Sequence, residues 1–341
     1  MQKTIFVVDD NDTNLAMAEE TLEDQYRVMT LPSAAKMFAL LEKVTPDLLL
    51  LDIEMPEMDG FEALKNLKAN NKYADIPVIF LTSMTDSSTE VHGFQLGVVD
   101  FITKPFSAPV LLNRIKTHLD IDGLIRERTA KIQQLQNGIV LVLADMVENR
   151  DQGTGGHVER TAAYIEILIK AMLERDIYAD SLRNLDLASL VSSARLHDVG
   201  KITIPDAILN KPGKLTAEEF DVMKTHCLEG ERIIDQIISR TGNVEFLQNA
   251  KKFASAHHER WDGKGYPHGL AGENVPLQGR VMAIVDVYDA LVSERPYKKP
   301  FTEEEAVNII TEGAGTQFDP LIAKLFSEVT GKFSEIRRSI A

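Results

Sequence analysis

The first third of the chain alternates short apolar runs with amphipathic stretches. Four runs have the length and composition of buried strands, namely TIFVV, DLLLLD, PVIFLT and DFITKP. EALKNLKAN and PVLLNRIKTHL instead space their apolar residues as helices do. Strands that alternate with helices predict an α/β domain, in which helices cover a parallel sheet, over roughly residues 1–120.

Polar side chains follow the predicted strands at their carboxyl ends, namely Asp9, Asp10, Asp52, Thr82 and Lys104. These ends meet at one edge of an open parallel sheet, where ligands bind. Three carboxylates suit Mg²⁺, which takes oxygen ligands. The ion can hold a phosphoryl group against Asp52 as the nucleophile, while Lys104 and Thr82 donate to its oxygens. The alternative is a sheet with acidic loops and no site.

This segment resembles the receiver domain of response regulators, because every signature position is filled. The resemblance implies a doubly wound parallel sheet of five strands, with Asp52 as the phosphoacceptor and a sensor histidine kinase as the partner. The residues it implies are Asp9, Asp10, Asp52 and the backbone carbonyl of Glu54 for Mg²⁺, and Thr82 and Lys104 for sensing the phosphate. Phe101 occupies the position of the family's switch aromatic, although the residue alone would indicate only core packing.

A second apolar pattern joins the two halves of the chain. The residues that recur at intervals of three, four and seven are Ile125, Ile132, Leu135, Ile139, Val142 and Met146. This spacing predicts a helical connector over residues 121–140 with a seam of the coiled-coil type. The seam fits either a helix packed on its own domain or a helix that pairs in a homodimer, and we favour the homodimer.

From about Asn149 onward the pattern is almost wholly helical. Apolar spacing also predicts a helix across Ser193–Ile202, which would carry His197 beside Asp198. Neighbouring helical positions point about 100° apart, so these two side chains cannot simply pair with each other. We expect His197 to bind one metal ion and Asp198 to bridge two.

Six of the eight histidines lie in this half, and most have other potential ligands nearby in the sequence. Asp286 lies in an otherwise apolar helical stretch, where an unpaired carboxylate is costly. Imidazoles and carboxylates favour manganese, iron, zinc or nickel over a thiolate zinc site. Their number suggests two ions about 3.5–4 Å apart, as in phosphoester hydrolysis. Cys227 is interpreted as a small core residue and His268 as an exposed residue that binds no metal.

HDVGK, HHERWDGKGYP and GTQFDP together resemble the HD-GYP branch of the HD-domain metal phosphohydrolases, over residues 141–335. The metal ligands that this resemblance implies are His157, His197, Asp198, His226, His257, His258 and Asp286. The family hydrolyses cyclic di-GMP to the linear dinucleotide pGpG, and some members continue to GMP. Some members also hold a third metal through a Glu four residues before the first ligand histidine. Gly153 fills that position here, so we expect two metals, with iron or manganese favoured and nickel or zinc as alternatives.

This chemistry suggests roles for four further residues. Lys201 is expected to stabilise charge on the phosphate or to assist proton transfer to the leaving oxygen. Arg295 and Lys298 match positions that hold substrate phosphates, although RPYKK alone would indicate an exposed loop. Tyr266 is expected either to pack against a guanine or to shape its loop.

Composition limits the partners of the chain. A net charge of −15 over 341 residues opposes broad contact with DNA or anionic lipid, so local cations must hold any phosphate ligand. One cysteine excludes an internal disulfide framework, and no apolar run reaches the roughly 18 residues of a membrane span. The N-terminus lacks the pattern of a signal peptide. We therefore expect a cytoplasmic protein without a membrane partner.

The sequence leaves three functions open. The leading hypothesis is a two-component enzyme in which phosphorylation of Asp52 controls hydrolysis of cyclic di-GMP, with a diguanylate cyclase as a further expected partner. A second is a phosphodiesterase for cyclic GMP-AMP or for pGpG, since ligand spacing does not reveal base selectivity. A third is a phosphorylation-controlled receptor that binds a cyclic dinucleotide without cleaving it.

Overall fold

The computed structural model describes residues 2–70, 72–83, 87–150, 156–293 and 299–340. The chain divides into two compact units, residues 1–132 and 133–341, and each is described by itself. Among the described residues, no helix combines the length and apolarity that a membrane-spanning helix needs.

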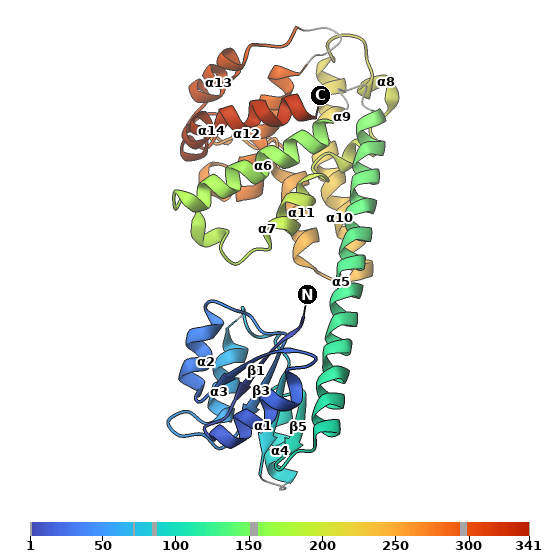
Figure 1. Ribbon diagram of the computed structural model, residues 1–341. Helices are drawn as coiled ribbons and strands as arrows, with labels where there is room; N and C mark the ends of the chain where they lie inside the picture. Colours follow the sequence, from blue (N-terminus) through green and yellow to red (C-terminus); the bar gives the residue numbers. More distant parts are fainter. Residues whose placement is uncertain (1, 71, 84–86, 151–155, 294–298, 341) are drawn as a thin grey trace. The chain divides into compact units, whose positions relative to one another are not determined.

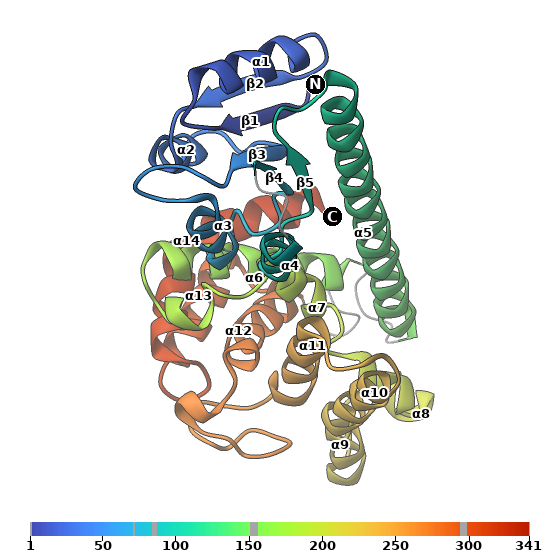
Figure 2. The ribbon, with the colours of Figure 1, turned by 90° about the horizontal axis from the view of Figure 1, so that it is seen from below.

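The first unit is an α/β domain (Figure 1). Its strands are β1 Thr4–Val8, β2 Arg27–Leu31, β3 Leu48–Asp52, β4 Val78–Thr82 and β5 Asp100–Thr103. Its helices are α1 Asp12–Leu22, α2 Ala34–Leu41, α3 Gly60–Ala69, α4 Ser87–Gln95 and the first part of α5 Ala108–Arg150. The strands are all parallel, in the order β2-β1-β3-β4-β5, which Figure 2 shows edge to edge. The predicted doubly wound five-stranded sheet is therefore confirmed.

Alternation along the strands gives the sheet two buried faces. In β1, Phe6 and Val8 pack with α2 and α3, whereas Ile5 and Val7 pack on the opposite face with α1 and α5. Both faces are apolar, which explains why the central strands read as continuous apolar runs. Strand β2 was not among the four runs identified in the sequence, because this edge strand is only partly buried and mixes polar with apolar residues.

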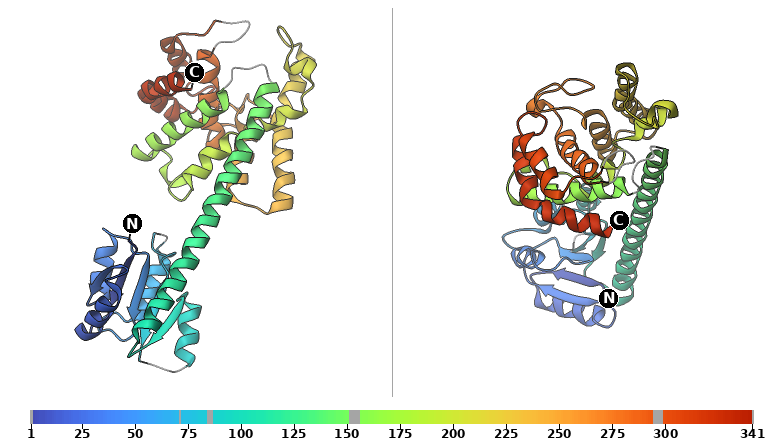
Figure 3. Two further views of the ribbon diagram at one scale, coloured as in Figure 1. Left: turned by 45° about the vertical axis from the view of Figure 1, so that its right-hand side comes forward. Right: turned by 90° about the horizontal axis from the view of Figure 1, so that it is seen from above.

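Helix α5 is one uninterrupted element of 43 residues, so the predicted connector is part of a longer helix (Figure 3). The residues of its predicted seam are exposed to solvent. Their exposed fraction ranges from 51% for Ile139 to 66% for Ile132 and Leu135. Toward the end of the helix, Val140, Ala144 and Val147 are instead buried in the second unit. The homodimer stays a prediction.

The second unit is helical, as predicted. After the end of α5, its α-helices are α6 His157–Glu174, α7 Leu187–Ala194, α8 Asp206–Leu209, α9 Ala217–Lys224, α10 His226–Thr241, α11 Glu245–Ala256, α12 Leu277–Val292, α13 Glu303–Glu312 and α14 Pro320–Ser339. Short 3-10 helices are η1 Ala179–Ser181, η2 Val199–Thr203 and η3 Gly272–Asn274. Helix α6 packs on α7, α12 and α14 around aromatic side chains such as Tyr164, Tyr288 and Phe333. Helix α10 packs on α11 and η2, which brings three segments with predicted ligands in or next to them near one another.

The predicted helix across Ser193–Ile202 is wrong. Helix α7 ends at Ala194, and the chain continues in turns whose hydrogen bonds join residues three apart, ending in η2. Within η2, Gly200 lies directly against α10, because a Cβ there would lie 1.9 Å from the carbonyl oxygen of His226. The backbones of η2 and α10 approach too closely for a side chain at this position. His197 and Asp198 therefore lie in the tight segment between α7 and η2.

Candidate metal centre

At the carboxyl edge of the sheet, three predicted residues form one buried ion-pair network. Nζ of Lys104 lies 2.7 Å from a carboxylate oxygen of Asp9 and 2.7 Å from one of Asp52. Carboxylate oxygens of Asp9, Asp10 and Asp52 lie within 4.8 Å of one another, so one cation can contact all three. Burial raises the pKa of Asp52, and Lys104 only partly offsets this effect.

The other predicted residues of this edge lie nearby or beneath it. Thr82 ends β4 and is buried, and Glu54 follows Asp52 with an exposed side chain. Phe101 is buried on β5, with its ring centroid 5.6 Å from that of Phe80 and 5.1 Å from that of Phe94. The predicted switch aromatic is thus buried in this structure.

In the helical unit, three buried imidazoles are oriented by their own backbone. In His197, His226 and His257, Nδ1 donates a hydrogen bond to the carbonyl three or four residues earlier, over 3.0, 2.7 and 3.0 Å respectively. A ring that donates through Nδ1 carries a lone pair on Nε2, which is the atom that binds metals. The local backbone therefore fixes each ring in the form needed for a ligand.

Asp198 lies between these imidazoles. One carboxylate oxygen, Oδ2, is 3.4 Å from Nε2 of His197, and the other, Oδ1, is 3.5 Å from Nε2 of His226 and 3.6 Å from Nε2 of His257. Lys201 Nζ also lies 2.8 Å from Oδ2. Burial alone would raise the pKa of Asp198, but Lys201 and the His197 and His257 rings hold it well below its usual range. The carboxylate is therefore charged and faces two groups of imidazoles.

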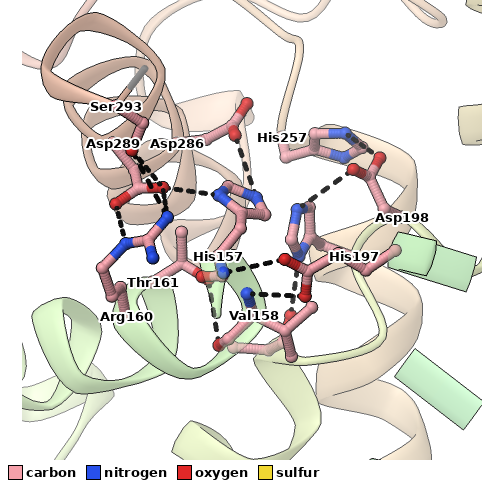
Figure 4. Close-up of polar contacts among 12 residues, drawn as sticks. His157, Val158, Arg160, Thr161, His197, Asp198, His257, Asp286, Asp289 and Ser293 are labelled. Atoms are coloured by element: carbon pink, nitrogen blue, oxygen red, sulfur yellow. Dashed lines mark hydrogen bonds and ion pairs between the residues drawn. The ribbon is translucent and has the colours of Figure 1, made fainter. Parts of the chain in front are cut away.

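His157 completes one of these groups from the start of α6 (Figure 4). Its Nε2 lies 3.5 Å from Oδ1 of Asp286, and its Nδ1 lies 2.8 Å from Oδ2 of Asp289. Arg160 binds both oxygens of Asp289, with Nε and Nη2 at 2.8 and 2.9 Å. Burial alone would lower the pKa of His157, but the bond to Asp289 and the charge of Asp286 outweigh it and raise the pKa.

His226, His257, His258 and the thiol of Cys227 form the other group, whose donor atoms lie within 4.8 Å of one another. Burial lowers the pKa of His226 to about 4, against the opposing charge of Asp198. Burial and the neighbouring rings hold the pKa of His258 well below its usual value. Both imidazoles are therefore neutral near pH 7, as metal ligands must be.

The residues of this centre fit bound cations. Nε2 of His226 and Nε2 of His257 lie 3.2 Å apart, so their two lone pairs face each other. Nε2 of His197 and Oδ1 of Asp198 are buried and have no hydrogen-bond partner among the described residues. Buried acceptors without partners are costly, and a cation between them removes that cost.

Tyr266 lies at the edge of this centre. Its ring centroid is 4.8 Å from that of His258 and 6.3 Å from that of Phe220. Glu259 is buried and accepts hydrogen bonds from the backbone amides of residues 268–270, which anchors the loop that carries Tyr266. The structure therefore places Tyr266 beside the predicted ligands rather than in a remote loop.

The end of α5 contacts two ligand segments of the same unit. Oε1 of Glu148 accepts a hydrogen bond of 2.8 Å from the backbone amide of His157. The guanidinium of Arg150 donates to the carbonyl of Ile202 at 2.7 Å and to that of Ile204 at 3.2 Å. Through these bonds the last turns of α5 hold both the start of α6 and the η2 segment.

Sequence reasoning missed Asp289, Arg160, Glu148 and Arg150. The available signal for Asp289 was a second acid three residues after Asp286 in the same apolar stretch, which puts both on one face of α12. Arg295 and Lys298 lie outside the described residues. His268 is 42% exposed in its side chain and lies 3.3 Å from Glu231, outside the two ligand groups.

Known proteins resemble both units. The profile of the response regulator receiver domain matches residues 5–116, and that of the HD domain matches residues 141–322. A probable cyclic di-GMP phosphodiesterase of Vibrio cholerae is 39% identical over 100% of this chain and 80% of its own.

Two further relatives differ in how much of the chain they match. The cyclic di-GMP phosphodiesterase response regulator RpfG of Xanthomonas campestris is 35% identical over 93% of this chain and 85% of its own. A 3'3'-cGAMP-specific phosphodiesterase 2 of V. cholerae is 39% identical over 61% of this chain and 38% of its own. The chain therefore belongs to the cyclic di-GMP phosphodiesterase response regulators, metal-dependent enzymes in which a receiver domain precedes an HD domain.

Proposed function

We propose that the helical unit hydrolyses cyclic di-GMP to pGpG at a two-metal site, and that phosphorylation of Asp52 controls this reaction. The observation that carries the proposal is the position of Asp198, whose two carboxylate oxygens face different imidazole groups. A carboxylate in this position would be shared by the residues that hold two cations. Bound divalent transition ions, iron or manganese in this proposal, would supply Lewis acidity that activates water and stabilises charge on the phosphate.

Each cation has its own set of residues. His157, His197 and Asp286 would hold one ion, and His226, His257 and His258 would hold the other, with Asp198 shared. Imidazoles that bind a metal are neutral, so only the carboxylates of Asp198 and Asp286 would offset part of the charge of two divalent ions. The ions would leave a net positive charge, which would favour a phosphodiester in a protein that is otherwise strongly acidic.

Lys201 and Tyr266 would act on the substrate. Lys201 Nζ is held at the rim of the centre by Asp198, with its side chain 20% exposed. From there the ammonium can donate to a phosphate oxygen or to the departing 3'-oxygen. Tyr266 offers an aromatic face beside His258, on which a guanine can stack. Arg295 and Lys298 would hold the other phosphate of the ring.

In the receiver, Mg²⁺ would be held by Asp9, Asp10, Asp52 and the backbone carbonyl of Glu54. Asp52 would take the phosphoryl group from a sensor histidine kinase. Lys104 already contacts Asp52 and Asp9, so its ammonium would pair with the new phosphoryl oxygens. Thr82 and Phe101 would report that change to the rest of the domain. A homodimer formed through α5, a diguanylate cyclase partner and a cytoplasmic location stay predictions.

The choice of substrate follows the relatives that match the whole chain, which are named for cyclic di-GMP. The relative named for 3'3'-cGAMP is equally identical over the region that it matches, so cyclic GMP-AMP is the second candidate. We propose that hydrolysis stops at pGpG, because Gly153 provides no ligand for a third metal.

The test is a turnover assay of the metal-reconstituted full chain on both cyclic dinucleotides and on pGpG, with and without an acyl-phosphate mimic. We expect pGpG to accumulate from cyclic di-GMP, with a rate that changes when the mimic is present. Substitution of both His197 and Asp198 by alanine should abolish turnover. Unchanged turnover by that variant would overturn the two-metal assignment, and identical rates with and without the mimic would overturn the control by Asp52.

A further inference from the structure

The thiol of Cys227 lies among the imidazoles of the second ligand group. Cys227 is fully buried, and its Sγ belongs to the set of donor atoms, with those of His226, His257 and His258, that lie within 4.8 Å of one another. Ligand atoms around a single ion with bonds of about 2.0–2.3 Å lie at most about 4.5 Å apart. The four donor atoms are therefore close enough to share one cation after small adjustments.

The thiol and a cation require the same lone pair. Sγ of Cys227 lies 3.4 Å from Nε2 of His226, whose Nδ1 already donates to a backbone carbonyl. Nε2 is thus an acceptor, and in the metal-free protein the thiol donates its hydrogen to it. A cation bound at Nε2 displaces that hydrogen. The sulfur then faces the cation directly, since the helix backbone keeps it in place.

The surroundings of this thiol independently point to a cation. Oδ1 of Asp198 is buried without a hydrogen-bond partner among the described residues, and it is directed at His226 and His257. The Nε2 atoms of those two histidines are themselves only 3.2 Å apart. Besides Nε2 of His226, which the thiol reaches, the pocket therefore holds two electron pairs that no described hydrogen satisfies, on Oδ1 of Asp198 and Nε2 of His257.

We propose that Cys227 is a thiolate ligand of the cation held by His226, His257 and His258, so that the two halves of the centre differ in chemical softness. This inference rests on the two-metal centre proposed above. On binding, the S–H bond breaks, its proton leaves to bulk water, and a bond between sulfur and the divalent metal forms without any change in oxidation state. Soft thiolate favours zinc, cobalt or ferrous iron on this side. His157, His197 and the carboxylates form a harder set that accepts manganese.

The experiment uses cobalt, because a thiolate bound to Co²⁺ gives a sulfur-to-metal charge-transfer band in the near ultraviolet. The full chain is stripped of metal and loaded with Co²⁺, and its spectrum is recorded with bound cobalt counted by elemental analysis. Cys227 is the single cysteine of the chain, so a protein charge-transfer band can arise only from it. We expect the band in the wild-type protein and its loss in Cys227→Ser. Wild-type protein that binds two cobalt ions without the band would overturn the proposal.

A second measurement needs no variant. In the zinc-loaded wild-type protein, X-ray absorption at the zinc edge should show a sulfur neighbour at about 2.3 Å beside nitrogen and oxygen at about 2.0–2.1 Å. A first shell of nitrogen and oxygen alone would contradict the thiolate ligand, even if the variant failed to fold.

The proposed function and this inference fail separately. Hydrolysis of a cyclic dinucleotide without any sulfur signal would remove Cys227 from the ligand set and leave the enzyme intact. A sulfur signal without hydrolysis of any of the three substrates would leave the ligand in place and overturn the proposed function.

Discussion

Oδ2 of Asp289 lies 2.8 Å from Nδ1 of His157, and the same carboxylate is held from its other side by Arg160. Four of the predicted ligand histidines have a described hydrogen bond at Nδ1. In His197, His226 and His257 the partner is a backbone carbonyl, whereas in His157 it is the side chain of Asp289. The orientation of His157 therefore depends on residues of α12 and α6 rather than on local geometry. Asp289 is a positioning residue in this arrangement.

Replacement of Asp289 by Asn should weaken the metal position next to His157. The Asn amide lacks the negative charge of Asp289 that favours the Nδ1–H form of the His157 ring. Loss of a residue that hydrogen-bonds to a metal ligand costs about 10- to 100-fold in metal affinity. Manganese affinity, measured by titration with electron paramagnetic resonance, should fall by this factor. Glu166→Gln on the exposed side of α6 is the matched control and should leave affinity unchanged. Equal affinity in both variants would show that Asp289 does not position His157.

The contact of Arg150 with η2 predicts a variant that separates catalysis from control. In Arg150→Gln the carbonyls of Ile202 and Ile204 lose their guanidinium partner, while the metal ligands remain. We expect the cobalt or manganese content to stay at the wild-type level and the effect of the acyl-phosphate mimic on turnover to shrink severalfold. Lys131→Gln, at a solvent-exposed position of the same helix, is the control. If the turnover of Arg150→Gln responds to the mimic as fully as that of the wild type, the bonds from Arg150 to this segment do not carry the control by phosphorylation.

The close approach at Gly200 predicts a severe effect from a single methyl group. In Gly200→Ala the new Cβ would meet the carbonyl oxygen of His226 at 1.9 Å, so η2 and α10 must separate. Overpacking of this kind costs about 1–3 kcal/mol or more of unfolding free energy. Gly331→Ala on α14, where a Cβ meets no atom within 4 Å, should be neutral or slightly stabilising. Chemical denaturation, followed by the circular dichroism of the helices, distinguishes the two variants. Equal unfolding free energies would contradict the backbone contact at Gly200.

The depressed pKa of His226 predicts that acid destabilises the metal-free helical unit. The unfolded histidine binds a proton near pH 6.5 but the folded one only near pH 4, so the unfolded state binds more protons between these values. Unfolding free energy should therefore fall, by up to about 3 kcal/mol from this residue, as pH drops through this window. The groups that face the ring are Asp198 just before η2, Lys201 within it, His257 and His258 after the end of α11, and the adjacent Cys227.

These neighbours also titrate or carry charge, so the contribution of His226 to the unfolding free energy is measured as the difference between the wild-type protein and His226→Gln. Chelator-treated wild-type protein should lose more unfolding free energy between pH 7 and pH 4 than His226→Gln, which cannot take up the proton. His268→Gln, outside the ligand groups, should follow the wild-type curve. Parallel curves for wild type and His226→Gln would contradict the assigned pKa.

Apolar pattern was sufficient to predict the sheet of the first unit and the helical character of the second. It failed at β2, because an edge strand has one solvated side and lacks a continuous apolar run. It also failed at Ser193–Ile202, where the periodicity is helical but the chain forms tighter turns and η2 packs closely on α10 at Gly200. That contact joins segments distant in sequence, and no local pattern encodes it.

The candidate ligands were recognised because imidazoles and acids are conspicuous in apolar helices. The residues that support them were not, since Arg150 and Glu148 look like ordinary charges at the end of a polar helix. Their role depends on which segments the fold places opposite them. Cys227 was interpreted as core from its size, and it is indeed buried, but burial beside three imidazoles gives the thiol a chemical environment that its sequence neighbours did not reveal.

The rings of His197, His226 and His257 are anchored by main-chain oxygens that lie three or four positions upstream. Every amino acid supplies such an oxygen, so mutation of a side chain at the anchoring positions cannot by itself remove the anchor. During divergence, the lining of the pocket can accordingly change its shape and substrate preference while the ring directions persist. A change in chain path, such as a proline or an inserted residue in one of the three turns, would instead rotate a ring away from the predicted metal position.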